Sequence, residues 1–226
     1  MKKLRKVLHN EMKTLRKILR NEDGFAVSLI ILVVALFAVV IAAMTIAGRS
    51  TSTTGSEQAG KVHASVIVQQ GNNLKGGFDV MINGKSIAIN QITFDNAANT
   101  GLFHPTDGTV PEQIPPSEAL VTATNKWVFK RDNNGDAVVK LKGIGLDANA
   151  DYVIALVDLK SAVCEQINKM LYGTSNVPSV TIASTAWNTP ETAVDLSADD
   201  NVDRRPYQCV KTSDDKYVYY QVIVEQ

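Results

Sequence analysis

Two cysteines are the residues of this 226-residue chain whose type most directly suggests covalent chemistry. Cys164 and Cys209 stand too far apart for a zinc knuckle, and neither His63 nor His104 occurs at a zinc-ligand spacing. In an oxidising compartment the two thiols can pair. The bond would close a loop of about 45 residues and stabilise the fold by roughly 4 kcal/mol in the chain-entropy model. The alternative is two unrelated buried thiols.

Two further motifs suggest ligand sites but lack essential parts. Residues 84–86 read Gly-Lys-Ser, as in a phosphate-binding loop, but Asp79 stands where that loop requires an earlier glycine. Residues 132–136 carry oxygen side chains without the spacing or the distal Glu of a calcium loop. The sequence also lacks the Gly-x-Ser-x-Gly motif of serine hydrolases. We therefore expect two plain turns, no metal or cofactor, and no enzymatic activity.

A long apolar stretch, residues 25–47, is the strongest signal for the organisation of the chain. It holds 23 residues without a charge, and Ser28 and Thr45 carry its only polar side chains. A helix of this length reaches roughly 35 Å, enough to cross a hydrocarbon core of about 30 Å. A cleaved secretory signal is the alternative, although its apolar core usually has only about 7–15 residues. Residues 45–48 would then form a weak cleavage site.

A basic leader, residues 1–24, precedes this stretch with eight Lys or Arg and three acidic residues. Such a segment stays in the cytoplasm by the positive-inside rule, and its leucines recur at helical spacing. We expect a basic amphipathic helix on the inner leaflet, with a nucleic-acid-binding arm as the alternative. Removing the leader leaves 15 of the 23 basic residues and 20 of the 23 acidic ones. The remaining acidic chain is not expected to have nucleic acid as its main partner.

The junction between leader and apolar stretch, Gly24-Phe25, resembles that of a type IV prepilin. The leader has a length similar to that of the type IVb subclass. The resemblance implies cleavage after Gly24, N-methylation of Phe25, and assembly through the apolar helix. Most major pilins have Glu at the fifth mature position, where this chain has Leu29. That departure weighs against a major subunit more than against membership of the pilin family, because some minor pilins and pseudopilins also lack the Glu.

A second resemblance lies around the two cysteines. Residues 160–175 and 207–212 are similar to the cysteine-bearing helix and closing strand of type IVb pilins of the bundle-forming kind. The resemblance covers the two ends of the chain, whereas residues 75–155 match no known pattern. It implies an α+β fold with a long N-terminal apolar helix, an antiparallel sheet and a disulfide-closed C-terminal region. In that family the cysteine-bounded segment is the exposed, variable part of the filament.

The remaining elements follow from periodicity and turn residues. Residues 48–74 are expected to continue the helix or form a linker, with Ala59, Val62, Val66 and Ile67 on one face and a stop at residues 71–73. Residues 75–226 would form the exported domain. Its expected elements are hairpins over 78–89, 127–141 and 207–224, irregular loops over 101–117 and 174–190, and a helix that Asp158 caps and Gly173 ends.

These features predict a structural subunit, a major or minor pilin or a pseudopilin, of a type IV pilus or a related secretion filament. Its partners would be copies of itself, other pilins, prepilin peptidase, an inner-membrane assembly platform and membrane lipid. It would begin as a single-pass bacterial inner-membrane protein with a cytoplasmic N-terminus, and would end in an extracellular pilus or periplasmic pseudopilus. The alternative is a signal-anchored inner-membrane protein whose exported domain binds a ligand or partner.

Overall fold

The computed structural model describes residues 52–145 and 149–226, and residues 56–226 form one compact unit. The expected leader 1–24, the apolar stretch 25–47, and with them Gly24, Phe25 and Leu29, lie outside the described residues. Among the helices that are described, none is both long enough and apolar enough to cross a membrane. The described part combines helices with a mainly antiparallel sheet.

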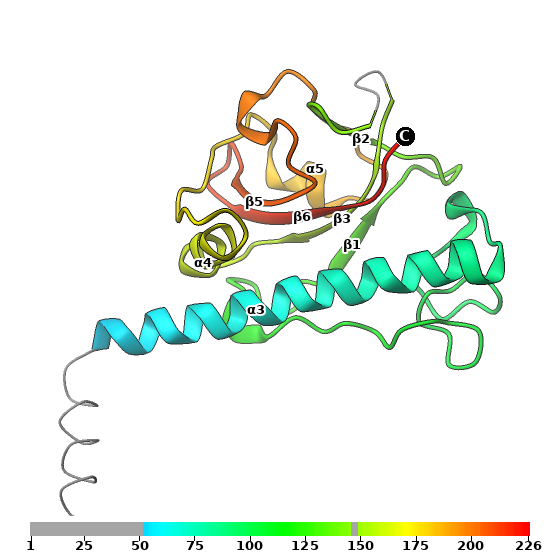
Figure 1. Ribbon diagram of the computed structural model, residues 1–226, viewed down its shortest axis with the longest axis horizontal. Coiled ribbons are helices and arrows are strands. Elements are labelled where there is room, and N and C mark those ends of the chain that lie inside the picture. Colours follow the sequence, from blue (N-terminus) through cyan, green and yellow to red (C-terminus); the bar gives the residue numbers. More distant parts are fainter. Residues whose placement is uncertain (1–51, 146–148) are drawn as a thin grey trace, which may run out of the picture. The chain divides into compact units, whose positions relative to one another are not determined.

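Helix α3, Ser52–Asp79, crosses one face of the sheet and ends in the π-helical turn η2, Val80–Gly84 (Figure 1). Apart from Gly77, the buried residues of α3 and η2 alternate at spacings of four and three, which places them on one stripe of the helix. The stripe comprises Gly60, Ala64, Ile67, Gly71, Leu74, Phe78 and Met81. The expected apolar face was only partly right: Ile67 is fully buried, but Ala59 is exposed, Val62 is 60% exposed, and small residues share the buried stripe.

The predicted hairpin over residues 78–89 was also wrong. Phe78 and Met81 are fully buried on the helix, and Asn83 and Gly84 belong to the turn that ends it. The alternation of apolar residues there fits a strand, but the same residues extend the buried helical stripe beyond Leu74. Packing of these large side chains in the core therefore overrides the local preference of Asn-Gly for a hairpin turn.

A four-stranded antiparallel sheet forms the centre of the fold, in the order β1-β3-β6-β5. Its strands are β1 Trp127–Lys130, β3 Tyr152–Val157, β5 Tyr207–Lys211 and β6 Tyr217–Val224. The closing hairpin of β5 and β6 is the one predicted from the sequence. Strand β3 is buried along its whole length because its two faces contribute to two separate cores.

The predicted hairpin over residues 127–141 was only partly right. Its turn is present, and Arg131 bridges to Ala137 across it. Beyond the turn the strands separate: β1 pairs with β3, while β2, Val139–Leu141, pairs in parallel with β4, Val194–Leu196. Helices α3 and α4, Ser161–Tyr172, lie on one side of the sheet, and the short helix α5, Ser184–Asn188, lies on the other (Figure 1).

Helix α4 ends as predicted and begins differently. Gly173 adopts the left-handed conformation that closes the helix, and its N–H donates to the carbonyl of Lys169. The N-terminal flanking residue is Lys160, not Asp158. The Asp158 carboxylate instead accepts from the Thr122 hydroxyl at 2.5 Å and from Lys216 Nζ at 2.9 Å. Asp158 therefore joins two loops and leaves the helix N-terminus uncapped by a side chain.

Candidate functional site

None of the catalytic or metal-binding patterns considered from the sequence forms a site in the described residues. His63 lies on α3, and His104 lies in a loop where its Nδ1 accepts from the Asp107 N–H at 3.0 Å. The Asp132 carboxylate accepts from two backbone N–H groups of its own turn, so the turn is closed internally. Within residues 52–145 and 149–226, no three His, Cys, Asp or Glu side chains are grouped to hold a metal ion.

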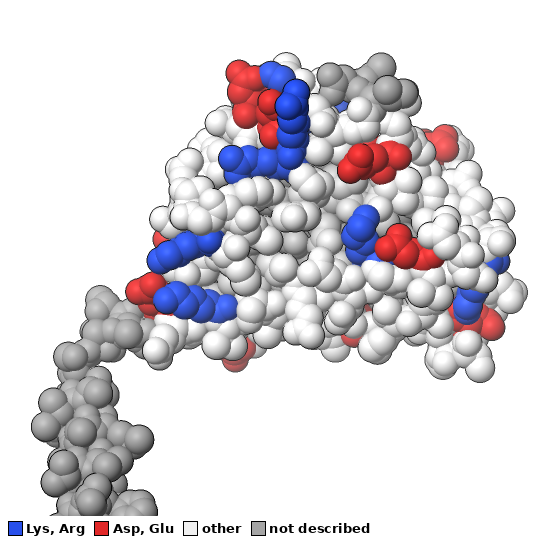
Figure 2. Space-filling model, in the orientation of Figure 1, with Lys and Arg blue, Asp and Glu red and all other residues white. Residues whose placement is uncertain are grey.

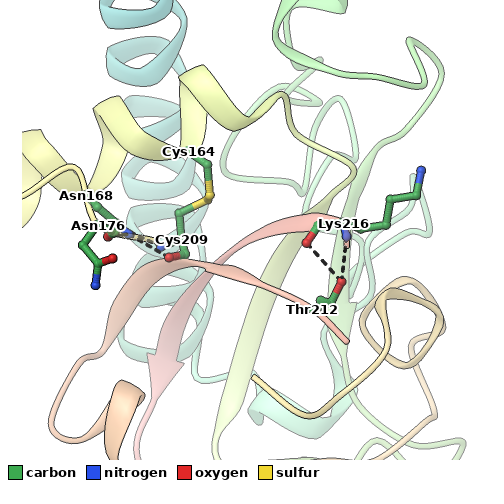
Figure 3. Close-up of a disulfide and its surroundings, with 6 residues drawn as sticks. All are labelled: Cys164, Asn168, Asn176, Cys209, Thr212 and Lys216. Atoms are coloured by element: carbon green, nitrogen blue, oxygen red, sulfur yellow. Dashed lines mark hydrogen bonds between the residues drawn. A yellow bond between two sulfur atoms is a disulfide. The ribbon is translucent and has the colours of Figure 1, made fainter. Parts of the chain in front are cut away.

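The structure joins Cys164 of α4 to Cys209 of β5 in a disulfide, as predicted (Figure 3). Their Cα atoms are 5.4 Å apart, and both side chains are fully buried. The bond closes the segment between the cysteines, called here the cysteine-bounded segment, residues 164–209. That segment includes α4 from Cys164 onward, α5 and β4, so it extends from the β5 edge of the sheet to the face opposite α3.

Asn168 stands one helical turn after Cys164 and binds the backbone of the partner cysteine (Figure 3). Its side-chain Nδ2 donates to the Cys209 carbonyl at 2.8 Å and to the Asn176 carbonyl at 2.9 Å. The Cys209 N–H donates to Asn168 Oδ1 at 2.9 Å. Sequence reasoning missed this residue, although its spacing of four from Cys164 puts the two side chains on one face of α4.

A buried lysine holds the far end of the cysteine-bounded segment. Lys130 of β1 is fully buried, and its Nζ donates to the carbonyls of Ala186 at 2.7 Å, Thr192 at 2.8 Å, and Thr189. Burial lowers the pKa of Lys130 to about 8, against the opposing effect of the Glu191 carboxylate. The ammonium binds carbonyls at the end of the short helix α5 and in the following turn, where the Thr189 carbonyl also accepts from the Thr192 N–H at 3.3 Å.

Two further contacts fix α5 on the sheet. The Asp214 carboxylate accepts from the Ser184 N–H at 2.8 Å and from its hydroxyl at 2.6 Å. These hydrogen bonds lower the pKa of Asp214 to about 2. The Trp187 ring is fully buried and stacks on Tyr220 of β6 at a centroid distance of 5.5 Å. The sequence suggested an irregular region here, so both the helix and its anchors were missed.

The contact between α3 and the sheet contains polar bonds as well as the buried stripe. Trp127 Nε1 donates to Gln70 Oε1 at 3.1 Å, and Gln221 Nε2 donates to Asn72 Oδ1 at 3.1 Å. Gly71 lies between these two contacts, where an added Cβ would come within 2.3 Å of Gln221 Oε1. A glycine at this position lets the helix backbone approach β6, and the directional bonds fix its register.

The charges on the described surface are mixed in sign. On the face drawn in Figure 2, basic and acidic side chains form small separate groups on a largely uncharged surface. Among the ion pairs of the described residues, Glu57 lies 3.2 Å from Lys61 and 3.8 Å from Lys169. Nucleic-acid binding usually requires a continuous basic surface, and this face does not provide one.

No family model, no curated protein and no solved structure matches this chain. Its function is therefore inferred from its own residues and contacts.

Proposed function

We propose that this protein is a structural subunit of a type IV pilus or a related secretion filament. Prepilin peptidase would cut it after Gly24, the new terminus at Phe25 would be methylated, and the helix over residues 25–47 would enter the filament core. The observation that carries the proposal is the junction itself. A basic leader ends in Gly24-Phe25, and 23 uncharged residues follow at once.

Assembly would exchange one apolar environment for another. In the membrane the helix over residues 25–47 is solvated by lipid tails, and in the filament it buries the same side chains against neighbouring copies. Leu29 replaces the carboxylate that neutralises a neighbouring terminal amine in most major pilins. This favours a minor pilin or pseudopilin over a major subunit.

The described domain supports a display role in two ways. Helix α3 follows the apolar stretch in sequence and carries the sheet on a stripe that includes two glycines, Gly60 and Gly71. The cysteine-bounded segment is closed by the disulfide and bonded at several points to the sheet, which suits a surface that must survive outside the cell.

N-terminal mass spectrometry on protein from native membranes and from sheared surface fibres tests the proposal. The expected mature chain begins at Phe25 and carries a methyl group on its amine. Gly24→Val should block this processing, whereas Gly48→Val, at the other end of the apolar stretch, should leave it intact. An unprocessed wild-type leader would contradict the proposal in favour of a signal-anchored membrane protein. A terminus near Gly48 would instead indicate a secreted soluble protein.

A further inference from the structure

Strand β5 is the last strand of the sheet, and in the described part of the chain its outer edge meets no further strand, only the single bridge between Lys211 and Ser179. The register pairs Gln208 with Tyr220 and Val210 with Val218 of β6. Backbone groups of successive residues in a strand point in opposite directions, so those of Tyr207, Cys209 and Lys211 point outward. Exposed outward groups of this kind form a template on which another strand can pair.

One face of α4 occupies this edge. Cys164, Asn168 and Tyr172 follow one another at intervals of four residues, so they lie along the same side of the helix. Cys164 bonds the side chain of Cys209, and Asn168 bonds both its N–H and its carbonyl. The Tyr172 hydroxyl donates to the Tyr207 carbonyl at 2.5 Å.

The chain after α4 completes the contact. The Lys211 N–H donates to the Pro178 carbonyl at 2.8 Å, and the Val180 N–H donates to the Lys211 carbonyl at 2.8 Å. The outward carbonyl of Tyr207 and both outward groups of Cys209 and Lys211 are therefore hydrogen-bonded within the same molecule. Asn168 is central because its amide offers Cys209 one acceptor and one donor, as a residue of a neighbouring strand would, and its second donor binds the Asn176 carbonyl.

We propose that α4 is an edge cover, in which the Cys164–Asn168–Tyr172 face occupies the outward groups of β5 and prevents another strand from pairing there. Asn168 supplies the backbone-like bonds, while the disulfide holds α4 at the edge. The inference is independent of filament assembly, since it concerns the folded domain of a single chain and does not require cleavage after Gly24.

Amide hydrogen exchange on the full-length oxidised protein in detergent tests the cover. In Asn168→Ala the Cys209 amide should exchange at least about tenfold faster, as expected for the loss of one buried hydrogen bond. The amides of β6 should keep their wild-type rates. Asn168→Ala should also form thioflavin-T-positive aggregates at rising protein concentration. Glu165→Ala, which removes an exposed side chain from the same helix, should match the wild type in both measurements.

Asn168→Asp distinguishes two causes of faster exchange at Cys209, the loss of its hydrogen bond to residue 168 and a general loosening of α4. Its carboxylate keeps an acceptor for the Cys209 N–H but sets negative charge against the Cys209 and Asn176 carbonyl oxygens, so the Cys209 amide should be protected less than in the wild type and more than in Asn168→Ala. Three results would overturn the inference: wild-type exchange and aggregation in Asn168→Ala, equal acceleration of β5 and β6 in that variant, or a Cys209 amide no better protected in a folded Asn168→Asp protein than in Asn168→Ala.

Discussion

Replacing Lys130 by Met would test whether the buried ammonium organises the far end of the cysteine-bounded segment. Methionine has nearly the same length and no charge, so the change removes the donor with little loss of volume. It leaves three carbonyls without the Lys130 ammonium, those of Ala186, Thr189 and Thr192. Hydrogen bonds from a charged donor contribute more than neutral ones, but burying the ammonium opposes that gain. We expect a net loss of about 3 kcal/mol in the free energy of unfolding at pH 7.

Urea unfolding of the purified protein, followed by tryptophan fluorescence, measures the loss. Lys126→Met is the matched control, because Lys126 is 70% exposed and forms only a surface ion pair with Glu112 at 2.8 Å. That variant should stay within about 0.5 kcal/mol of the wild type. If Lys130→Met is no less stable than Lys126→Met, the ammonium does not hold the segment.

The pH dependence of the same variant gives a second test. The folded pKa of Lys130, about 8, lies below the unfolded value of 10.5. As pH rises from about 8 toward 10.5, the folded chain releases a proton that the unfolded chain still holds. The wild type should therefore gain stability in this window relative to lower pH. Lys130→Met lacks this gain, so its deficit against the wild type should widen. A constant deficit would refute the assignment of the pKa shift to this lysine.

Three other predictions concern separate contacts. Replacing Cys164 and Cys209 together by Ala should lower the free energy of unfolding by about 4 kcal/mol in the chain-entropy model, measured as the shift in urea midpoint against the oxidised wild type. In α3, Gly76→Ala should raise stability by about 0.5–1 kcal/mol because an added Cβ meets open space, whereas Gly71→Ala should lower it because the Cβ meets a buried glutamine amide. Thermal melts that rank these two variants in the opposite order would contradict the described helix–sheet contact. Asp214 has a folded pKa of about 2, below its unfolded 3.8, so its stabilisation is present above pH 3.8 and is lost as pH falls toward 2. Asp214→Asn should reduce the fall in melting temperature across that window.

The C-terminal part of the fold was predictable because local signals and packing agree there. Gly173 stops α4 in the left-handed conformation that glycine adopts without strain, and the β5–β6 hairpin joins two neighbouring strands. The predicted hairpin over residues 127–141 was only partly right because local signals and long-range pairing disagree there. β2 pairs with β4, which lies more than fifty residues further along the chain, and no local pattern identifies so distant a partner.

The buried stripe of α3 shows a second limit of prediction from hydrophobic periodicity. Sequence reasoning sought large apolar residues on one face and chose Val62, which is exposed. The true stripe contains Gly60, which faces α4, and Gly71, which faces β6. A residue without a side chain gives no hydrophobic signal, so its burial can be recognised only after the partner surface is known.

In the candidate site, the sequence predicted the disulfide between Cys164 and Cys209 but not the hydrogen bonds that support it. Two cysteines in a domain that the leader predicts to be exported are enough to suggest a disulfide. Asn168 and Lys130 form their bonds to backbone groups, which carry no sequence signature of their own. Spacing alone could have placed Asn168 beside Cys164, but nothing in the sequence indicated that β1 would reach α5.

In the proposed subunit, the helix over residues 25–47 would serve assembly and the cysteine-bounded segment would serve display. The supporting contacts suggest how these two parts could be kept structurally separate. The cysteine-bounded segment is tied to the β5 edge by Cys164 and Asn168, and to β1 by Lys130. Its α5 and β4 pack on the face of the sheet opposite α3, whereas α4 packs on the same side as α3. Exposed residues around α5 and β4 can therefore change without moving the stripe on which α3 packs. In the proposed filament, such an arrangement would let the outer surface vary while the helix that leads into the filament core keeps its geometry.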